Sequence, residues 1–354
     1  MSLKLLQLLT FFMLLNCKAQ IAPLYVGTYT NGDSEGIYKL DFNTETGELN
    51  NKTLAVATQN PSFITFSPNK NFLYAVGEGE TSAVTAFKLN EDGTLKLINS
   101  ESSNGKGPCH VALNELGDKA VVSNYGGGTI SIYSINENGS LEKASQIFNH
   151  NEDNEKPARA HSAKFYKDDL FVSDLGRNRF YQYKLVDNTY QLESNSIINI
   201  EGNPGPRHFS ISKDGSFIYI INEYGGSITS IERTDSGFKQ IDFDSVLSDP
   251  NAEKSWSADI HLSKNERFLY GSDRVENTIA VFKRDKTTGS IVKIHNISVN
   301  GEGPRNFILD PTGKFLLVAN QYSENISVFI VDKTTGTLQF LHDVKVPTPV
   351  CLLF

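Results

Sequence analysis

Arg207 and Glu223, two side chains of opposite charge, bracket a stretch that predicts two antiparallel strands. Apolar residues alternate with serines after Arg207, Lys213-Asp214-Gly215 is a turn signal, and an apolar, β-branched and aromatic run follows at residues 217–221. Glu223 comes directly after that run. Burying a carboxylate there is unfavourable unless the carboxylate is paired or functional. The two residues therefore either form an ion pair that locks the strands together or belong to a site.

Other residues with suitable chemistry stand at or beside equivalent positions elsewhere in the chain. They are His110, Tyr125, His161, His208, Arg274 and Arg305. The chain has only nine arginines, and three of them, Arg207, Arg274 and Arg305, are candidates. Guanidinium groups bind carboxylates and phosphates, and imidazole and carboxylate groups transfer protons. As a set, these residues predict a polar site that binds an anion.

Each candidate also has a structural interpretation. His161 is explained as a buried histidine that hydrogen-bonds a neighbouring strand, and Arg274 as a surface residue after a strand. Arg305 and His110 are weaker candidates when taken singly, and Glu78 is expected to lie in a solvated turn. The hypothesis of a site therefore depends on the set and not on any one member.

The elements that would position these residues form a repeat with a period of about 47 to 51 residues. The repeat contains seven apolar runs, at residues 24–28, 73–77, 120–124, 170–174, 218–222, 269–273 and 316–320. A polar or aromatic residue follows six of the runs, and Leu175 follows the other. Each run is followed by a turn, an alternating strand, a hairpin turn and a less apolar strand. Four antiparallel strands at this period predict an all-β fold, a seven-bladed β-propeller.

The two ends of the repeat complement each other. The first copy lacks a strand before Leu24, and the last copy is followed by a surplus Pro-then-apolar segment at residues 346–354. The C-terminal strand is therefore expected to complete the N-terminal blade and close the ring, which removes open sheet edges. Residues 20–354 then form one domain, because a split near residues 149–157 finds a polar loop but no change of pattern. In such a ring the candidate residues converge at one mouth of the central channel.

Composition excludes several classes of function. A net charge of −8 argues against a nucleic-acid surface. The three cysteines, at positions 17, 109 and 351, are too few and too scattered for a disulfide framework or a zinc site. No Gly-x-Ser-x-Gly elbow and no His-rich or Asp-rich cluster is present. We therefore expect no metal, no cofactor, a small-molecule ligand and a monomer.

The N-terminus differs in kind from the rest of the chain. Lys4 precedes an apolar block, residues 5–15, that is too short to span a bilayer comfortably but fits the core of a signal peptide. Residues 1–19 would be removed before Gln20, or a loose lipobox at residues 14–17 would leave a lipid anchor on Cys17. We expect an exported protein, periplasmic or anchored to an outer membrane, with no membrane span.

Several motifs together resemble those of a known family. They are Ala-His-Ser-Ala at 160–163, Asp-Leu-Gly at 174–176, Gly-Pro-Arg-His at 205–208, Asn-Glu-Tyr at 222–224 and Phe-Leu-Tyr-Gly-Ser-Asp-Arg at 268–274. With the seven copies, they look like the lactonase family of seven-bladed propellers, which includes propeller-type 6-phosphogluconolactonases and fungal carboxymuconate cyclases. The resemblance covers residues 23–354.

The resemblance implies a carboxylic ester hydrolase that opens 6-phospho-D-glucono-1,5-lactone or a related sugar lactone. It places the family's active-site residues on His161, Arg207, Glu223 and Arg274, which we expect to be catalytic. His110, Tyr125, His208 and Arg305 are then expected to bind the substrate.

In this interpretation Arg207 and Arg274 bind an anionic group and stabilise the oxyanion, and His161 or Glu223 takes a proton from water. Two alternatives stay open, a non-catalytic propeller that binds a ligand or protein at the mouth and a muconate-lactonising cyclase. The apolar N-terminus departs from the cytosolic family members, which act on a sugar-phosphate lactone.

Overall fold

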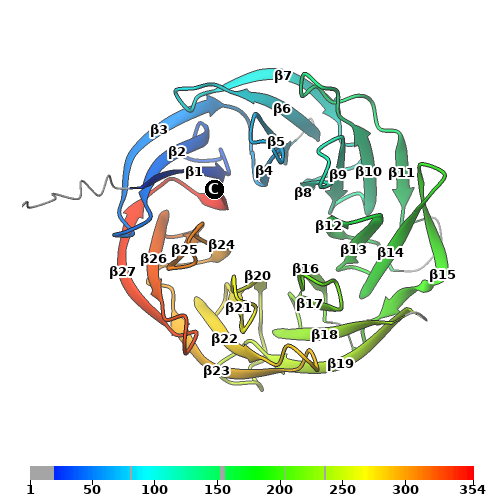
Figure 1. The fold of residues 1–354 in the computed structure, drawn as a ribbon, viewed down its shortest axis with the longest axis vertical. Coiled ribbons are helices and arrows are strands. Elements are labelled where there is room, and N and C mark those ends of the chain that lie inside the picture. The colour runs from blue at the N-terminus through cyan, green and yellow to red at the C-terminus, as the bar shows by residue number, and fades with distance from the viewer. Residues whose placement is uncertain (1–19, 80–81, 152–155, 203, 235–236) are drawn as a thin grey trace, which may run out of the picture.

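The computed structural model describes residues 20–79, 82–151, 156–202, 204–234 and 237–354. The predicted signal segment, residues 1–19 with Cys17, lies outside these ranges. Within them the chain forms 28 strands, arranged as seven sheets of four strands each. The sheets stand around a common axis as the blades of a propeller (Figure 1). This confirms the predicted all-β fold with seven four-stranded antiparallel blades.

Each blade contributes one strand at each of four distances from the ring's centre (Figure 1). The innermost strands are β28 (Pro349–Leu353), β4 (Ile64–Phe66), β8 (Pro108–Leu113), β12 (Ala160–Tyr166), β16 (Pro206–Ile211), β20 (Ser257–Leu262) and β24 (Pro304–Leu309). The second strands are β1 (Ile21–Thr28), β5 (Phe72–Gly77), β9 (Lys119–Asn124), β13 (Asp169–Asp174), β17 (Phe217–Asn222), β21 (Phe268–Asp273) and β25 (Phe315–Asn320).

The two outer positions are filled in the same order. The third strands are β2 (Gly36–Asn43), β6 (Ala83–Leu89), β10 (Thr129–Ser134), β14 (Arg179–Val186), β18 (Ser227–Thr234), β22 (Thr278–Arg284) and β26 (Asn325–Val331). The outermost strands are β3 (Leu49–Ala57), β7 (Leu95–Ser102), β11 (Gln146–Asn149), β15 (Thr189–Asn199), β19 (Gly237–Ser245), β23 (Ile291–Ser298) and β27 (Leu338–Lys345).

Burial explains why the second strands give the clearest sequence signal. Every residue of β17, β21 and β25 is buried, because adjacent blades cover both faces of these strands. Strands covered on both faces are expected to be continuous apolar runs. The outermost strands expose more of their residues, four of eight in β7 and five of eight in β27, so their sequences are less apolar.

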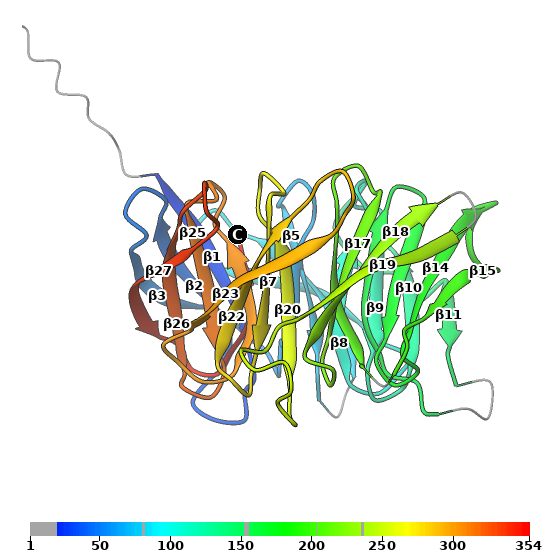
Figure 2. The same ribbon diagram turned by 90° about the horizontal axis from the view of Figure 1, so that it is seen from below.

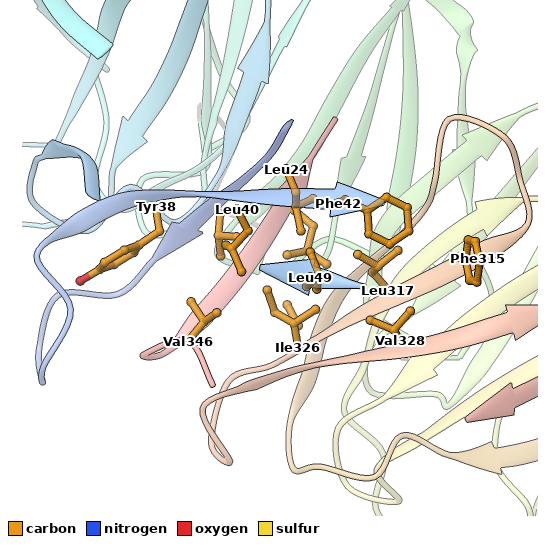
Figure 3. Packing of buried hydrophobic residues seen from close by; sticks show 13 residues of the cluster. Leu24, Tyr38, Leu40, Phe42, Leu49, Phe315, Leu317, Ile326, Val328 and Val346 are labelled. Atoms are coloured by element: carbon orange, nitrogen blue, oxygen red, sulfur yellow. The ribbon is translucent and has the colours of Figure 1, made fainter. Parts of the chain in front are cut away.

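The ring closes where the two ends of the described chain meet. In β28, Leu352 lies opposite Val26 of β1 and Leu353 lies opposite Tyr25. Side chains from both sides of this seam form one apolar cluster (Figure 3). Phe42 of β2 contacts Phe315 of β25 edge to face, with ring centroids 5.7 Å apart. The predicted closure by the C-terminal strand is confirmed.

A repeated hydrogen bond ties neighbouring blades together. In four blades a tyrosine of the second strand donates its hydroxyl to the carbonyl oxygen of a hairpin glycine in the next blade. The pairs are Tyr25 with Gly93 (2.8 Å), Tyr74 with Gly139 (2.9 Å), Tyr219 with Gly289 (3.0 Å) and Tyr270 with Gly336 (3.1 Å). Gly289 has a φ of +73°, and a Cβ there would lie 2.2 Å from the Phe217 ring, so both backbone and packing require glycine.

The repeated strand order determines where chemistry can gather. The ring is shallow, and its strands run between two faces (Figure 2). Because the strands follow in the same order in every blade, the starts of the innermost strands and the ends of the second strands meet at one face. No helix among the described residues is long and apolar enough to cross a bilayer.

Deletion of residues 346–354 should abolish the cooperative thermal unfolding of the folded ring. The deletion removes the buried side chains of β28 and leaves β1 with an unpaired edge. Leu352→Ala keeps the strand but removes most of one buried side chain. It should lower the free energy of unfolding by about 2 to 5 kcal/mol and preserve the fold. Both variants are compared with the parent by circular-dichroism melting. A truncated protein that melts like the parent would refute the role of closure.

Candidate functional site

A shift in strand register positions the side chains at the ring's centre. In six blades the pairing between the innermost and second strands shifts near the start of the innermost strand. The residues passed over by these shifts are Cys109, His161, Arg207 and His208, Ala258 and Asp259, Arg305, and Val350. A bulge of this kind re-aims a side chain and is common beside active sites. The positions that the sequence repeat aligned are therefore the bulged ones.

The residue that follows each second strand forms the other half of the arrangement. Its backbone N–H donates to a carbonyl just before the innermost strand of the same blade, as Glu223 does to Gly205 (2.7 Å) and Arg274 does to Trp256 (3.1 Å). Tyr125 makes the same bond to Gly107 (2.9 Å). These bonds hold the residue that follows the second strand beside the start of the innermost strand of the same blade.

Glu223 joins two guanidinium groups. Its Oε2 lies 2.9 Å from Arg207 Nε in the same blade and 3.1 Å from Arg274 Nη2 in the next blade. Arg207 is 2% exposed, and Glu223 and Arg274 are 8% and 9% exposed. One carboxylate thus neutralises two buried cations only in part, and the cluster keeps a net positive charge.

The guanidinium groups are anchored, but their hydrogen bonds are incomplete. Arg207 Nη1 donates to the Ala258 carbonyl, and Arg274 Nε donates to the Trp256 carbonyl at 3.0 Å. Arg207 Nε and Arg274 Nη2 approach Glu223 closely, but neither N–H points at an acceptor well enough to form a hydrogen bond among the described residues. A buried donor without an acceptor costs about 1 to 3 kcal/mol. An anionic ligand would relieve this cost.

Arg305 belongs to a second network of hydrogen-bonded side chains. Its Nη2 donates to the Tyr29 hydroxyl (2.8 Å), which in turn donates to Glu78 Oε2 (2.8 Å). The Arg305 guanidinium also lies 5.3 Å from the centre of the Tyr29 ring. Glu78 is therefore part of a network that crosses three blades, not the solvated turn residue expected from the sequence.

His161 is buried between aromatic and sulfur groups. Its ring centroid lies 5.6 Å from that of Tyr125 and 5.2 Å from that of His208, and its Nδ1 is 4.0 Å from the Cys109 sulfur. Burial, followed by the charge of Arg207, holds the pKa of His161 well below its usual range. His161 is therefore a neutral imidazole at neutral pH.

Three further groups near the centre have altered pKa values. Burial raises the pKa of the Cys109 thiol to about 12, so this thiol stays protonated. Burial, followed by the charge of Arg207, lowers the pKa of Arg274 to about 10, which leaves it cationic at neutral pH. Burial also holds the pKa of His110 well below its usual range.

The structure separates the predicted residues into connected and isolated members. Glu223 contacts both Arg207 and Arg274 directly. His161 is linked to this cluster by the charge of Arg207, which acts on its pKa, and its ring packs near Tyr125. Arg305 contacts none of these side chains by a hydrogen bond or ion pair among the described residues, although its charge acts on the pKa of Arg207.

His110 and His208 lie beside each other, with ring centroids 5.6 Å apart, and Phe63 packs on His110 at 4.3 Å. Sequence reasoning missed Asp259, which binds His208, as well as Tyr29 and Asn306. A signal for Asp259 was present, because it is the third residue of its innermost strand, β20, as His110 and His208 are in β8 and β16. Among the described residues, no three His, Cys, Asp or Glu side chains are arranged to hold a metal ion.

Comparison with known proteins gives consistent matches. The family model described as "Lactonase, 7-bladed beta-propeller" matches residues 23–354. A 6-phosphogluconolactonase of Formosa agariphila is 34% identical over 313 residues, which are 82% of this chain and 87% of that protein. A 6-phosphogluconolactonase of Bacillus subtilis is 31% identical over 299 residues, with 81% of this chain and 85% of that protein covered.

Solved structures agree over nearly the whole ring. A structure described as a putative 6-phosphogluconolactonase from Bacteroides fragilis has a TM-score of 0.87 and 32% identity, and covers 96% of this chain and 98% of that one. The periplasmic gluconolactonase of Pseudomonas aeruginosa has a TM-score of 0.89 and 27% identity, with 94% and 99% covered. Sequence motifs, blade architecture and these matches agree, and the chain belongs to the lactonase family of seven-bladed β-propellers.

Proposed function

We propose that this protein hydrolyses a sugar lactone at the centre of the ring, with His161, Arg207, Glu223 and Arg274 in contact with the substrate. The observation that carries the proposal is the pair of buried guanidinium groups on one shared carboxylate, each with an N–H that lacks an aligned acceptor. Lactone hydrolysis passes through a tetrahedral oxyanion, and fixed donors in a dry site stabilise such a charge strongly.

Two substrates are supported by the relatives. The curated relatives are named 6-phosphogluconolactonases, which supports 6-phospho-D-glucono-1,5-lactone. The Pseudomonas aeruginosa neighbour is named a gluconolactonase, which supports the unphosphorylated lactone. Three arginines near two glutamates leave positive charge for a phosphate or for the oxyanion alone. We propose that Arg305, Tyr125, His110 and His208 line the same site.

The proton acceptor in this proposal is an imidazole. Glu223 is already engaged in ion pairs with two guanidinium groups, through the same carboxylate oxygen. Cys109 stays protonated and is a poor nucleophile. The histidines near the centre are neutral at neutral pH, so each has a lone pair that can accept a proton from water.

We further propose that the protein is exported. Lys4 followed by the apolar residues 5–15 supports a signal sequence, and Cys17 supports a lipid anchor as one form of the mature protein. The structural neighbour from Pseudomonas aeruginosa is a periplasmic protein. An exported enzyme encounters unphosphorylated lactones more readily than sugar phosphates, so this proposal favours gluconolactone.

The purified protein should accelerate the opening of 6-phosphoglucono-1,5-lactone, glucono-1,5-lactone or both. The measurement is proton release or loss of lactone, corrected for the spontaneous reaction in the same buffer. Muconolactone and carboxymuconate, added to the same panel, test the cyclase alternative. If no lactone is turned over faster than in buffer alone, hydrolysis is refuted and the interpretation as a binding module is favoured.

Arg207→Ala should remove about 3 kcal/mol of transition-state stabilisation, which lowers kcat/KM for the active lactone by a factor of about 10². Arg207→Lys should lose less, because it keeps the charge but not the two-pronged guanidinium. Arg284→Ala is the matched control, because Arg284 is also buried but lies on the third strand of its blade, β22, where it bonds Tyr219 of the neighbouring blade. The control should lower the melting temperature without changing kcat. Equal losses of activity in both alanine variants would contradict the assignment of Arg207 to the site.

Glu223→Gln separates a catalytic cluster from a structural ion pair. If Glu223 positions the two arginines for chemistry, the variant should stay folded and lose most of its activity. Activity and melting temperature are measured on the same preparation. A variant that unfolds readily but keeps full activity per folded molecule would show that the Arg207–Glu223 pair is structural.

Acidification below pH 6.5 should destabilise the folded protein. Burial, followed by the charge of Arg207, lowers the pKa of His208 to about 3, whereas the unfolded chain has the usual value near 6.5. Between these values only the unfolded state binds this proton. The free energy of unfolding therefore falls by about 1.4 kcal/mol per pH unit for this residue. Urea unfolding at pH 5, 6 and 7 measures this effect. The free energy of unfolding should depend less steeply on pH in His208→Gln than in the wild type, and an equal pH dependence in the two proteins would contradict this account.

A further inference from the structure

Asp259 is a buried carboxylate that accepts hydrogen bonds from three blades. His208 Nδ1 donates to Oδ1 at 2.7 Å, and His261 Nε2 and Asn306 Nδ2 donate to Oδ2 at 3.0 Å and 2.6 Å. The backbone N–H groups of residues 260 and 307 also donate to it, at 3.0 Å and 3.2 Å. Burial alone would raise the pKa of Asp259, but His261 and the hydrogen bonds from both histidines outweigh burial and hold this pKa well below the usual value.

This carboxylate fixes the tautomer of His208. An ionised Asp259 offers only acceptors, so the nitrogen of His208 that faces it, Nδ1, must carry the proton. Neutral His208 then has its lone pair on Nε2. A carboxylate that orients an imidazole in this way is a recurrent element of hydrolytic sites.

His208 Nε2 is buried and has no hydrogen-bond partner among the described residues. Its ring stands with its centroid 5.2 Å from that of His161 and 5.6 Å from that of His110, whose Nδ1 is also buried without a partner. His208 and Arg207 are passed over by the same register shift, so the imidazole and the guanidinium start from one bulge. Two unpartnered imidazole nitrogens beside the arginine cluster indicate a place for a polar atom, such as the oxygen of a water molecule.

His161 lacks these features. Its Nδ1 faces the Cys109 sulfur at 4.0 Å, and no carboxylate of the described residues bonds its ring. His161 is therefore suited to contact the substrate, whereas His208 has an oriented ring and an unpartnered nitrogen.

We propose that His208 is the general base of the lactonase reaction and that Asp259 is its positioning residue. This inference rests on the function proposed above. His208 Nε2 takes a proton from water while the water oxygen bonds to the lactone carbonyl carbon. The carbonyl oxygen becomes an oxyanion that faces the guanidinium groups of Arg207 and Arg274. When the intermediate collapses, the carbonyl re-forms, the bond from carbon to ring oxygen breaks, and His208 returns the proton to the ring oxygen. The product is the open hydroxy acid.

Binding of substrate assists this base. Burial, followed by the charge of Arg207, lowers the pKa of His208, and an anionic substrate or a developing oxyanion offsets the contribution of Arg207. The basicity of the imidazole therefore rises when the substrate is in place.

His208→Gln should lower kcat by a factor of about 10² to 10⁴ with a small change in KM. His161→Gln should instead change mainly KM. Asp259→Asn should lower kcat by a factor of about 10 to 10², because the amide can donate to Nδ1 and favour the wrong tautomer. Asp259→Glu, which retains the charge, should recover part of this loss. All constants are expressed per folded molecule, with melting temperatures measured in parallel.

His150→Gln is the matched control for loss of a buried imidazole. His150 bonds Asp174 at 2.8 Å and the Tyr183 hydroxyl at 2.8 Å, so it has the same carboxylate partnership in the outer part of another blade. This variant should lose stability but keep kcat. If His208→Gln behaves like this control while the wild type is active, the inference about the base is wrong and the proposed function stands. If the wild type is inactive on every lactone, the proposed function fails and the inference fails with it.

Nitrogen NMR of ¹⁵N-histidine-labelled protein gives a readout that does not depend on turnover. The signals that disappear in His208→Gln identify this ring. At pH 7 its Nδ1 should be protonated and its Nε2 should have the shift of a bare nitrogen, and only Nε2 should move when the aldonate product is added. The opposite tautomer in the wild type, or an unchanged tautomer in Asp259→Asn, would overturn the role of the pair.

Discussion

The seven sheets form a closed ring because the last strand pairs with the first, and this closure organises the rest of the molecule. The pairing of Leu352 in β28 with Val26 in β1 turns a row of blades into a ring. Closure then fixes the spacing of the innermost strands, and the register shifts at their starts aim side chains at the centre. Blade cores stay apolar, whereas the centre collects charge that no blade could bury by itself.

The charges at the centre are balanced only in part. A buried carboxylate or guanidinium without a partner would cost about 3 to 5 kcal/mol, and Glu223 avoids this by facing both Arg207 and Arg274. The partial balance leaves positive charge and unaligned N–H groups among largely buried side chains. Such a site is organised for a negative charge before that charge appears, which is the basis of electrostatic catalysis. The stability of the ring and its proposed chemistry therefore depend on the same ion pairs.

Sequence reasoning identified the fold well because the second strands, such as β17 and β21, are buried on both faces and repeat as apolar runs. It also aligned Arg207, His161 and Arg305, since the strand starts recur at a constant period. It missed Asp259 and underestimated Glu78, whose partners, His208 and Tyr29, come from other blades. A repeat shows which positions are equivalent, but not which side chains at those positions touch. Contacts between blades depend on ring curvature and on side-chain length, which periodicity does not encode.

The bulge at the start of the innermost strand in six of the blades has an evolutionary consequence. Each of these blades presents its own side chain or pair of side chains at an equivalent bulged position, as with Cys109, His161 and Arg305. A substitution at one such position changes one wall of the ligand environment and leaves the backbone of the other six blades as it was. Such a scaffold can diversify its specificity one residue at a time, with the cost of each change confined to a single blade.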